Sequence, residues 1–297
     1  MLQQIREKGF KNLDHAKILE KEEIAKGIFR FLISAPLVAC KARPGQFVVV
    51  LPYQKGERVP FTIQDSDPEN GTITLVVQVV GKTSHYISTM EPGDRFYSLL
   101  GPLGVSLDEE IKDLPKSKVL IVGGGVGIAP LFPKAKSLKK DYGAYLWTVV
   151  GYRTKELIHL ADEMKQFSNK FELFTDDGTA GRKGLVTVGV EEALQSEKFD
   201  FAVVIGPPRM MQAVAELTRK YDLKTLVSLN TIMVDGTGMC GSCRVLVGGK
   251  VRFACVDGPI FDGHEVDWNE LAARNSRYRD EEKLSYELWL KERGLID

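Results

Sequence analysis

Three of the four cysteines in this 297-residue chain lie close together near its C-terminal end, at Cys240, Cys243 and Cys255. The spacing C-x2-C-x11-C places two thiols on one tight loop and brings back a third, which is a ligand pattern for a metal centre. Glycines at three positions of the same loop let the backbone wrap tightly and turn its N–H groups inward. This arrangement favours an anionic iron–sulfur cluster over a disulfide.

The segment between the second and third cysteines predicts a β-hairpin. Residues 244–247 and 250–255 have strand composition, and Gly248-Gly249 between them is a strong two-residue turn signal. A hairpin with this turn places Cys243 opposite Ala254. The third cysteine then returns beside the first two.

A fourth ligand is needed to complete the site, and Asp235 is the candidate. The plant-type [2Fe-2S] pattern is C-x4-C-x2-C with a distant fourth cysteine, and Asp235 occupies its first position. The predicted set is therefore Asp235, Cys240, Cys243 and Cys255. Two alternatives stay open, which are a structural zinc site that uses His264 and a group of reduced core thiols. An aspartate before glycine is also an ordinary turn residue.

The bulk composition excludes some classes of partner. Lysine plus arginine and aspartate plus glutamate each number 40, so the net charge is zero. This argues against nucleic acid or an anionic membrane as the main partner. The sequence has no 18-residue apolar run and no signal-peptide pattern at its start. Clustered rather than scattered cysteines fit a reducing compartment, so we expect a cytoplasmic protein.

Residues 1–113 predict an antiparallel β-barrel. Segments 28–35, 45–51 and 72–80 are rich in β-branched and aromatic residues and are separated by proline and glycine turn signals. We expect Gly101-Pro102-Leu103-Gly104 to form a turn that leads out of the barrel.

Two short motifs in this region carry groups that a flavin needs. Arg58-Val59-Pro60-Phe61-Thr62 offers a cation, an apolar surface and a hydroxyl. Gly81-Lys82-Thr83-Ser84 follows a strand and starts a helix, where backbone N–H groups suit a pyrophosphate. Each motif alone is also compatible with a purely structural role. The first motif could be an exposed arginine beside a core phenylalanine, and the second could be an ordinary helix cap. Together they predict FAD binding by Arg58, Pro60, Phe61, Thr62, Gly81, Lys82, Thr83 and Ser84.

Residues 114–229 predict an open parallel α/β domain, because strand patterns alternate with helical ones. The segment Gly123-Gly124-Gly125-Val126-Gly127 follows the first buried strand and precedes a helix, which is where dinucleotide phosphates bind. A glycine turn needed only for helix–strand packing is the alternative. We expect Gly123, Gly124, Gly125, Val126 and Gly127 to contact NAD(P).

Later loops of the same domain lie at strand C-terminal ends, where ligands gather in such sheets. Their candidate NAD(P)-binding residues are Arg153, Asp176, Asp177, Gly206, Pro207 and Met210. Each of these loops could equally be a solvated turn. Basic residues without an acidic neighbour follow the second strand, so the sequence permits either NAD or NADP.

Residues 230–297 predict an iron–sulfur segment followed by a helical tail. The tail has helical spacing around Leu284 and Leu288, and its aromatic residues are Tyr278, Tyr286 and Trp289. The tail either packs on the body of the protein or contacts a second subunit.

The order of these parts resembles the ferredoxin–NADP reductase superfamily. More narrowly, the chain resembles the dihydroorotate dehydrogenase B electron-transfer subunits and the small (alpha) subunits of NADH-dependent reduced ferredoxin:NADP oxidoreductases, also described as sulfide dehydrogenase small subunits. The segments that carry the resemblance are 58–62, 81–83, 123–130, 175–184, 234–243 and 253–259. The first type has cysteine as its first cluster ligand, whereas Asp235 in this chain matches the second.

The resemblance implies FAD, a [2Fe-2S] cluster and NAD(H) or NADP(H) as cofactors, with hydride and electron transfer performed by FAD and no catalytic side chain. It also implies a heterodimer with a larger subunit that carries another FAD and [4Fe-4S] clusters, performs flavin-based electron bifurcation and exchanges electrons with ferredoxin. A dihydroorotate dehydrogenase B subunit is the alternative function. A non-enzymatic, zinc-stabilised scaffold is the alternative of another class.

Overall fold

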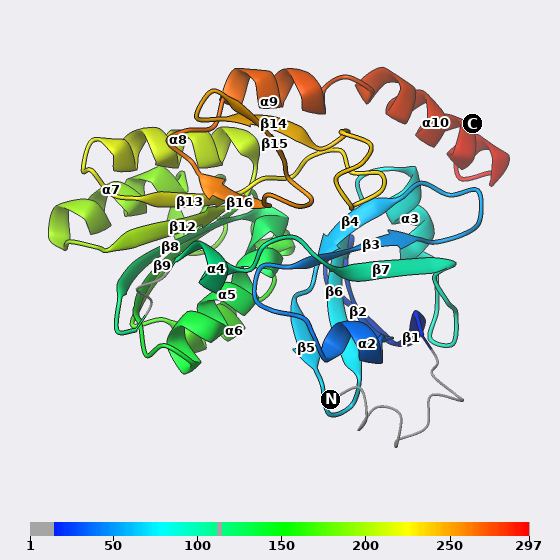
Figure 1. The fold of residues 1–297 in the computed structure, drawn as a ribbon, viewed down its shortest axis with the longest axis horizontal. Helices are drawn as coiled ribbons and strands as arrows, with labels where there is room; N and C mark the ends of the chain where they lie inside the picture. The colour runs from blue at the N-terminus through cyan, green and yellow to red at the C-terminus, as the bar shows by residue number, and fades with distance from the viewer. Residues whose placement is uncertain (1–14, 112–114, 297) are drawn as a thin grey trace.

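The computed structural model describes residues 15–111 and 115–296. Figure 1 shows an antiparallel lobe on the right, an α/β lobe on the left and a C-terminal segment that runs across both at the top. The predicted fold class, an antiparallel barrel, a parallel α/β domain and a small C-terminal segment, is confirmed. Among the described residues, no helix combines the length and the apolar character needed to cross a membrane.

The antiparallel lobe consists of two sheets that share one hydrophobic core. Their strand orders are β1-β2-β6-β5 and β4-β3-β7. The bounds are β1 (Lys17–Ala25), β2 (Ile28–Ser34), β3 (Phe47–Leu51), β4 (Val59–Thr62), β5 (Asp65–Asp67), β6 (Thr72–Gln78) and β7 (Ser98–Leu103), with helices α2 (Pro36–Ala39), α3 (Lys82–Ser88) and α4 (Leu107–Glu110). Alternate residues of both sheets, such as Phe31, Ile73 and Val48, are fully buried between them. The lobe is barrel-like because two antiparallel sheets enclose one core with their inward-facing side chains.

The turn expected at residues 101–104 is not observed, because residues 101–103 belong to a strand. Strand β7 continues to Leu103, which pairs with Phe47 of β3, and the pairing shifts register between Phe47 and Val49. The shift is a β-bulge that accommodates Pro102, a residue that cannot donate to a regular ladder. The glycine–proline signal therefore marks a bulge within the strand.

The α/β lobe is built on a seven-stranded sheet in the order β11-β10-β9-β8-β12-β13-β16. Its strands are β8 (Lys118–Gly124), β9 (Tyr145–Tyr152), β10 (Lys170–Thr175), β11 (Arg182–Lys183), β12 (Phe201–Ile205), β13 (Thr225–Ser228) and β16 (Ile260–Asp262), and they are parallel except for the edge strand β16. Helices α5 (Ile128–Lys140) and α6 (Ala161–Phe167) cover one face, and α7 (Val186–Ser196) and α8 (Pro208–Arg219) cover the other. Short 3-10 turns η2 (Gly125–Gly127) and η3 (Lys155–Leu157) follow β8 and β9. The chain reverses its direction across the sheet between β8 and β12, which is the point where such folds bind ligands.

The C-terminal segment contacts both lobes. It contains the hairpin β14 (Arg244–Val247) and β15 (Lys250–Phe253), then β16, α9 (Trp268–Asn275) and α10 (Arg279–Glu292). Strand β16 pairs with β13 at the edge of the parallel sheet. Helix α10 reaches the other lobe, where it packs on α3. The segment therefore connects the two lobes rather than hanging from one of them.

Candidate iron–sulfur and nucleotide sites

The β14–β15 hairpin brings two cysteines together in the protein interior. The Ala254 N–H donates to the Cys243 carbonyl at 3.1 Å, so these residues lie opposite each other, as the sequence predicts. The Cys243 and Cys255 side chains are both 2% exposed, and their sulfur atoms are 3.2 Å apart. This distance exceeds the ~2.05 Å of a disulfide bond, so both are free thiols. Burial raises the pKa of the Cys255 thiol to about 12.

Asp235 and Cys240 form a second pair at the outer side of the same loop. The Asp235 carboxylate accepts hydrogen bonds from the backbone N–H groups of Thr237 at 2.7 Å and Cys240 at 2.6 Å. The hydrogen bond from Thr237 is the main reason that the pKa of Asp235 is lowered. The Cys240 side chain is exposed, and its sulfur lies 3.3 Å from the Ser242 hydroxyl oxygen.

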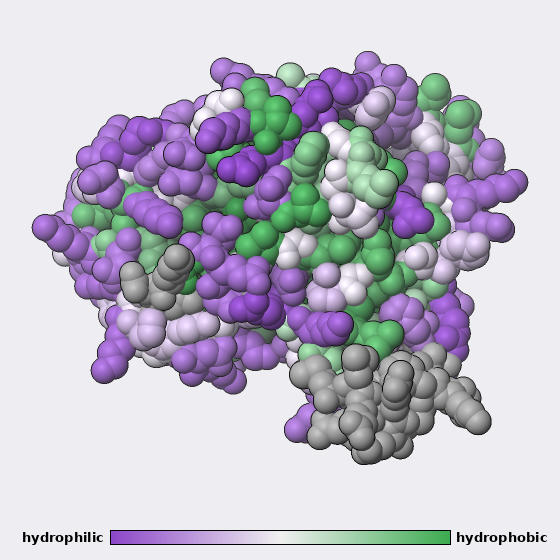
Figure 2. Space-filling model, in the orientation of Figure 1, coloured by the Kyte–Doolittle hydropathy of each residue, from purple (hydrophilic) through white to green (hydrophobic). Residues whose placement is uncertain are grey.

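A glycine fixes the position of this loop against the antiparallel lobe. Gly236 has φ +75°, and a Cβ there would lie 2.7 Å from Leu103 of β7. Figure 2 shows the molecule in the orientation of Figure 1, with hydrophobic and near-neutral residues gathered across the middle of the visible face and hydrophilic residues toward its rim. Met239, beside Cys240, is 89% exposed.

The donor chemistry of the loop fits an iron–sulfur cluster. Within the described ranges, no three His, Cys, Asp or Glu side chains converge on a single metal position. The loop instead holds two pairs of donors, one buried and one outer. Three thiols and a carboxylate supply the sulfur and oxygen donors that iron accepts.

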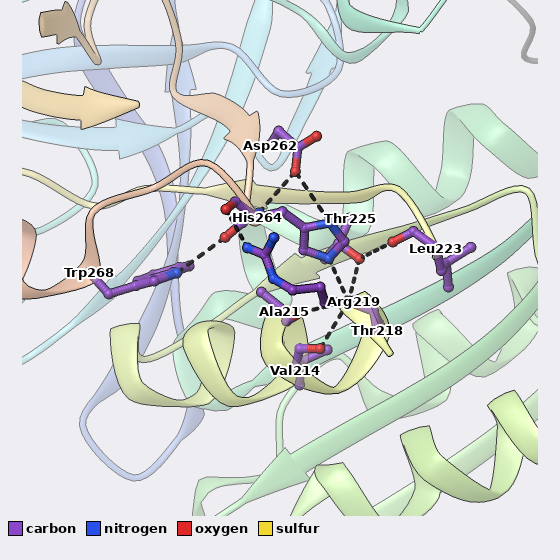
Figure 3. Close-up of polar contacts among 10 residues, drawn as sticks. Val214, Ala215, Thr218, Arg219, Leu223, Thr225, Asp262, His264 and Trp268 are labelled. Carbon is purple, nitrogen blue, oxygen red and sulfur yellow. Dashed lines mark hydrogen bonds and ion pairs between the residues drawn. The ribbon is translucent and has the colours of Figure 1, made fainter. Parts of the chain in front are cut away.

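The structural zinc site that we considered as an alternative depends on His264, and this residue is engaged elsewhere. Figure 3 shows the His264 ring directed toward helix α8, where its Nε2 lies 3.2 Å from the Thr218 hydroxyl oxygen. Its Nδ1 lies 3.9 Å from the Asp262 carboxylate, and Arg219 donates to its backbone carbonyl. The His264 ring thus lies against α8 at the edge of the parallel sheet, and among the described residues it does not converge with the cysteines on a metal position.

The first candidate flavin motif lies on strand β4. Phe61 packs against the core of the antiparallel lobe together with Val59. Because side chains alternate along a strand, Pro60 and Thr62 face the opposite side, and both are half-buried. The backbone of Phe61 pairs with Val48 of β3.

The second candidate flavin motif surrounds the start of α3, and an acidic residue that the sequence analysis missed binds to it. The Lys82 ammonium lies 3.1 Å from the Glu57 carboxylate, and the buried Thr83 hydroxyl also donates to Glu57. The Ser84 hydroxyl accepts the N–H of Gly81 at 3.0 Å, so it caps its own helix. No local signal marks Glu57, because it lies 26 residues before Thr83.

The candidate nucleotide loops after β8 and β12 come together in the structure. A Cβ on Gly127 would lie 2.6 Å from the Ile205 carbonyl oxygen and 2.7 Å from Gly206 Cα. A Cβ on Gly124 would lie 2.3 Å from the Met210 sulfur. Only glycine allows this approach of the two backbones. Gly123, Gly124, Gly127, Gly206, Pro207 and Met210 thus meet at the switch point of the sheet.

Arg153, Asp176 and Asp177 lie together at the ends of β9 and β10. The Asp176 N–H donates to the Tyr152 carbonyl at 3.0 Å, and the Asp177 N–H donates to the Arg153 carbonyl. The Asp177 carboxylate accepts from the N–H and the hydroxyl of Thr179, which lower its pKa. The aspartate therefore organises its own turn.

Two family profiles match the chain. The iron–sulfur cluster binding domain of dihydroorotate dehydrogenase B matches residues 230–267, and the oxidoreductase NAD-binding domain matches residues 121–216. The first match contains all four candidate cluster ligands, and the second contains the loops at the switch point of the parallel sheet.

Two relatives resemble the chain over most of its length. The dihydroorotate dehydrogenase B (NAD(+)) electron transfer subunit homolog of Thermotoga maritima is 49% identical over 278 residues, which are 94% of this chain and 96% of the relative. The corresponding subunit of Clostridium acetobutylicum is 30% identical over 86% of this chain and 97% of its own length.

Solved structures show the same architecture. A structure of NADH-dependent reduced ferredoxin–NADP oxidoreductase, determined for insight into flavin-based electron bifurcation, has a chain with TM-score 0.86 and 45% identity, over 95% of this chain and 100% of that chain. Amycolatopsis cytochrome P450 reductase, with TM-score 0.56 and 22% identity over 69% of this chain and 65% of its own, shares the fold. The chain is therefore an NAD-binding, iron–sulfur oxidoreductase subunit that belongs to the family of dihydroorotate dehydrogenase B electron-transfer subunits, within the ferredoxin–NADP reductase-like proteins.

Proposed function

We propose that this chain is the small subunit of an electron-bifurcating NADH-dependent reduced ferredoxin:NADP oxidoreductase. In this role it passes electrons between NAD(P)H, FAD, a [2Fe-2S] cluster and a larger subunit with its own flavin and [4Fe-4S] clusters. The single observation that carries the proposal is Asp235, which stands at the first position of the ligand pattern in the sequence and accepts a hydrogen bond from the Cys240 backbone N–H. The 45% identity to a chain of that enzyme supports it.

The cysteine loop would hold the cluster as two donor pairs. Cys243 and Cys255, buried with sulfurs 3.2 Å apart, would ligate the inner iron. Asp235 and Cys240, joined through the hydrogen bond from the Cys240 N–H, would ligate the outer iron. Two pairs rather than one convergent set suit a two-iron cluster, since each iron then receives two protein ligands.

The other candidate residues would position the nucleotides. Gly123 to Gly127 and Gly206 would bring backbone N–H groups close to the NAD(P) pyrophosphate. Lys82 and Thr83 would bind the FAD pyrophosphate after release from Glu57. Pro60 and Thr62 would face the flavin from β4, and Arg58 would do so from the residue before this strand. When bound, FAD supplies the exchange between a two-electron hydride and single electrons. The protein contributes binding, orientation and exclusion of water.

The experiment is low-temperature EPR of the anaerobically purified, chemically reduced full chain. We expect a spin-half [2Fe-2S] signal near one spin per chain, and we expect Asp235→Cys to keep the spin count while changing the g-values, because a thiolate replaces the oxygen donor. Asp257→Asn is the matched control, since Asp257 also accepts a backbone N–H near the cysteines. A g-tensor that is identical in wild type and Asp235→Cys would exclude Asp235 as a ligand.

A dihydroorotate dehydrogenase B electron-transfer subunit is the second candidate, which the match of residues 230–267 favours. The native complex distinguishes the two. Reduction of its flavins by dihydroorotate would support the second candidate, and NADPH-dependent reduction of ferredoxin in the presence of NAD would support the first.

A further inference from the structure

A cavity of about 300 Å³ lies beside the cysteine loop, between residues 231–234, the start of β14 and the junction of α9 with α10. Among the candidate cluster ligands, Cys240 lines it, whereas Asp235, Cys243 and Cys255 do not. The cavity therefore adjoins the candidate cluster loop on the side of Cys240.

The wall of this cavity is strongly basic. Arg244, Arg274 and Arg277 line it, and no acidic residue does. Arg274 is partly neutralised, because its Nη2 donates to the Ser242 carbonyl at 3.1 Å and its Nε lies 3.7 Å from Glu270. Within the described part of the chain, Arg244 and Arg277 form no ion pair. Two exposed arginines without an ion pair among the described residues thus line one small space.

A buried hydroxyl on the same wall has no partner. Thr231 lines the cavity and is 6% exposed, and within the described residues its Oγ1 makes no hydrogen bond. An unsatisfied buried hydroxyl destabilises a protein, so its retention needs a reason. A ligand that accepts its hydrogen bond would supply that reason.

We propose that this cavity is a binding site for a small, multiply charged oxyanion of the polycarboxylate or phosphate class. Guanidinium groups recognise carboxylate and phosphate through paired N–H···O bonds. The Thr231 hydroxyl adds a neutral donor on the same wall, whereas the Asn275 amide nitrogen already donates to the Asn230 carbonyl at 3.0 Å. The volume of about 300 Å³ lies at the lower end of small-ligand sites.

The proposed anion site shares Cys240 with the candidate cluster loop. We therefore expect anion binding to depend on the oxidation state of the cluster. A bound anion opposes the arrival of a further negative charge nearby. By linkage, the oxidised protein then binds the anion more tightly than the reduced protein. Adventitious binding elsewhere on the surface would lack this dependence.

The test is calorimetric titration of citrate and, separately, inorganic phosphate into the anaerobically purified, cluster-containing full chain at low ionic strength. We expect one saturable site, tighter in the oxidised protein. Thr231→Val and Arg277→Gln should each weaken binding about tenfold, the loss of one strong hydrogen-bonded contact. Arg279→Gln is the matched control, because Arg279 is exposed and does not line the cavity. It should change affinity by less than about twofold.

Several outcomes would overturn the site. These are the absence of saturable binding for both anions, or equal weakening by Arg277→Gln and Arg279→Gln, which would indicate long-range charge alone. Thr231→Val removes an unpartnered hydroxyl without leaving a cavity, so its fold should survive, and thermal unfolding checks this. Binding that is lost when the chain is in its native complex would indicate that an acidic side chain of the larger subunit fills the cavity. This result would overturn the proposal of a site for a free ligand.

Discussion

Lys134 is a fully buried lysine in helix α5. Its ammonium donates to the Pro130 carbonyl of its own helix at 3.1 Å, and its side chain lies against Gly45 of the other lobe. Burial lowers the pKa of Lys134 to about 7, whereas an unfolded lysine has a pKa of about 10.4. The residue therefore sits in an environment that opposes its charge.

Replacement of Lys134 by methionine should stabilise the protein in a pH-dependent way. Below pH 7 the folded wild type holds a buried charge, and Lys134→Met should raise the free energy of unfolding by on the order of 4 kcal/mol. Between pH 7 and about 10.4 the unfolded state binds more protons, so wild-type stability rises with pH and the advantage shrinks to zero. Urea unfolding across this range measures the effect. Lys136→Met, which removes a half-buried ion pair with Asp65, is the control, and an advantage that stays constant with pH would contradict the account.

Glu57 competes for the groups that we assign to the FAD pyrophosphate. Its carboxylate is 55% exposed and holds Lys82 and Thr83. Glu57→Gln keeps an acceptor of the same shape but removes the negative charge, so FAD should bind about two- to fivefold more tightly. Quenching of flavin fluorescence on titration of the deflavinated full chain measures this. Glu69→Gln, at an exposed turn, should have no effect, and weaker FAD binding by Glu57→Gln would show that Glu57 orients Lys82 instead.

At the scale of elements, helix α10 fastens the C-terminal segment to the antiparallel lobe. Ser285 accepts from Lys82 at 2.8 Å, and Tyr286 hydrogen-bonds His85 at 2.8 Å. The Trp289 ring is 8% exposed and lies 5.0 Å from the His85 ring. The opposite face keeps Leu288 52% exposed. The tail thus packs on the body through Tyr286 and Trp289 and presents leucines outward.

Trp289→Ala should detach this helix. Loss of a buried tryptophan typically removes about 3–5 kcal/mol of stability, which exceeds the other contacts of α10. We expect faster hydrogen exchange in residues 279–292 and lower retention of FAD on gel filtration. Leu288→Ala, its exposed neighbour, should change stability by less than about 0.5 kcal/mol. Unchanged exchange in Trp289→Ala would show that the polar contacts suffice.

At the scale of the whole molecule, the cysteine hairpin and the parallel sheet share one hydrophobic core. Cys243, Val245 and Ala254 belong to the same buried cluster as Leu120 and Val122 of β8. Strand β16 of the same segment completes the edge of that sheet. The candidate cluster site is therefore part of the support of the nucleotide-binding lobe.

Removal of the cluster should weaken the whole protein rather than the loop alone. Oxidative removal of iron, followed by chelation, leaves thiols without the ligands that hold the hairpin together. We expect a lower midpoint of thermal unfolding by calorimetry and weaker NADH binding. Chelator alone, without the oxidant, is the control. An unchanged thermal midpoint in the iron-free protein would show that the hairpin folds independently of its metal.

The sequence alone determined the order of the parts and the local geometry of the cysteines. Successive strand patterns identify the antiparallel lobe, and strand patterns that alternate with helical patterns identify the α/β lobe. Both kinds of pattern reflect which face of each element is buried. The Gly248-Gly249 turn sets the hairpin register, and with it the approach of Cys255 to Cys243. These features depend on neighbours within about a dozen residues, so sequence patterns report them.

Only the tertiary structure decided which distant segments meet. Lys82 and Ser285 form a hydrogen bond although they are 203 positions apart. Glu57 approaches Thr83 from a separate loop. Strand β16 of the C-terminal segment pairs with β13 of the parallel sheet. Strand β7 continues through Pro102 because it pairs with β3, a distant partner that a local turn signal does not reveal. The basic cavity beside Cys240 likewise forms only where residues 231–234, β14 and α9 converge. Such contacts arise from burying complementary faces, and a linear pattern shows each face without showing its partner.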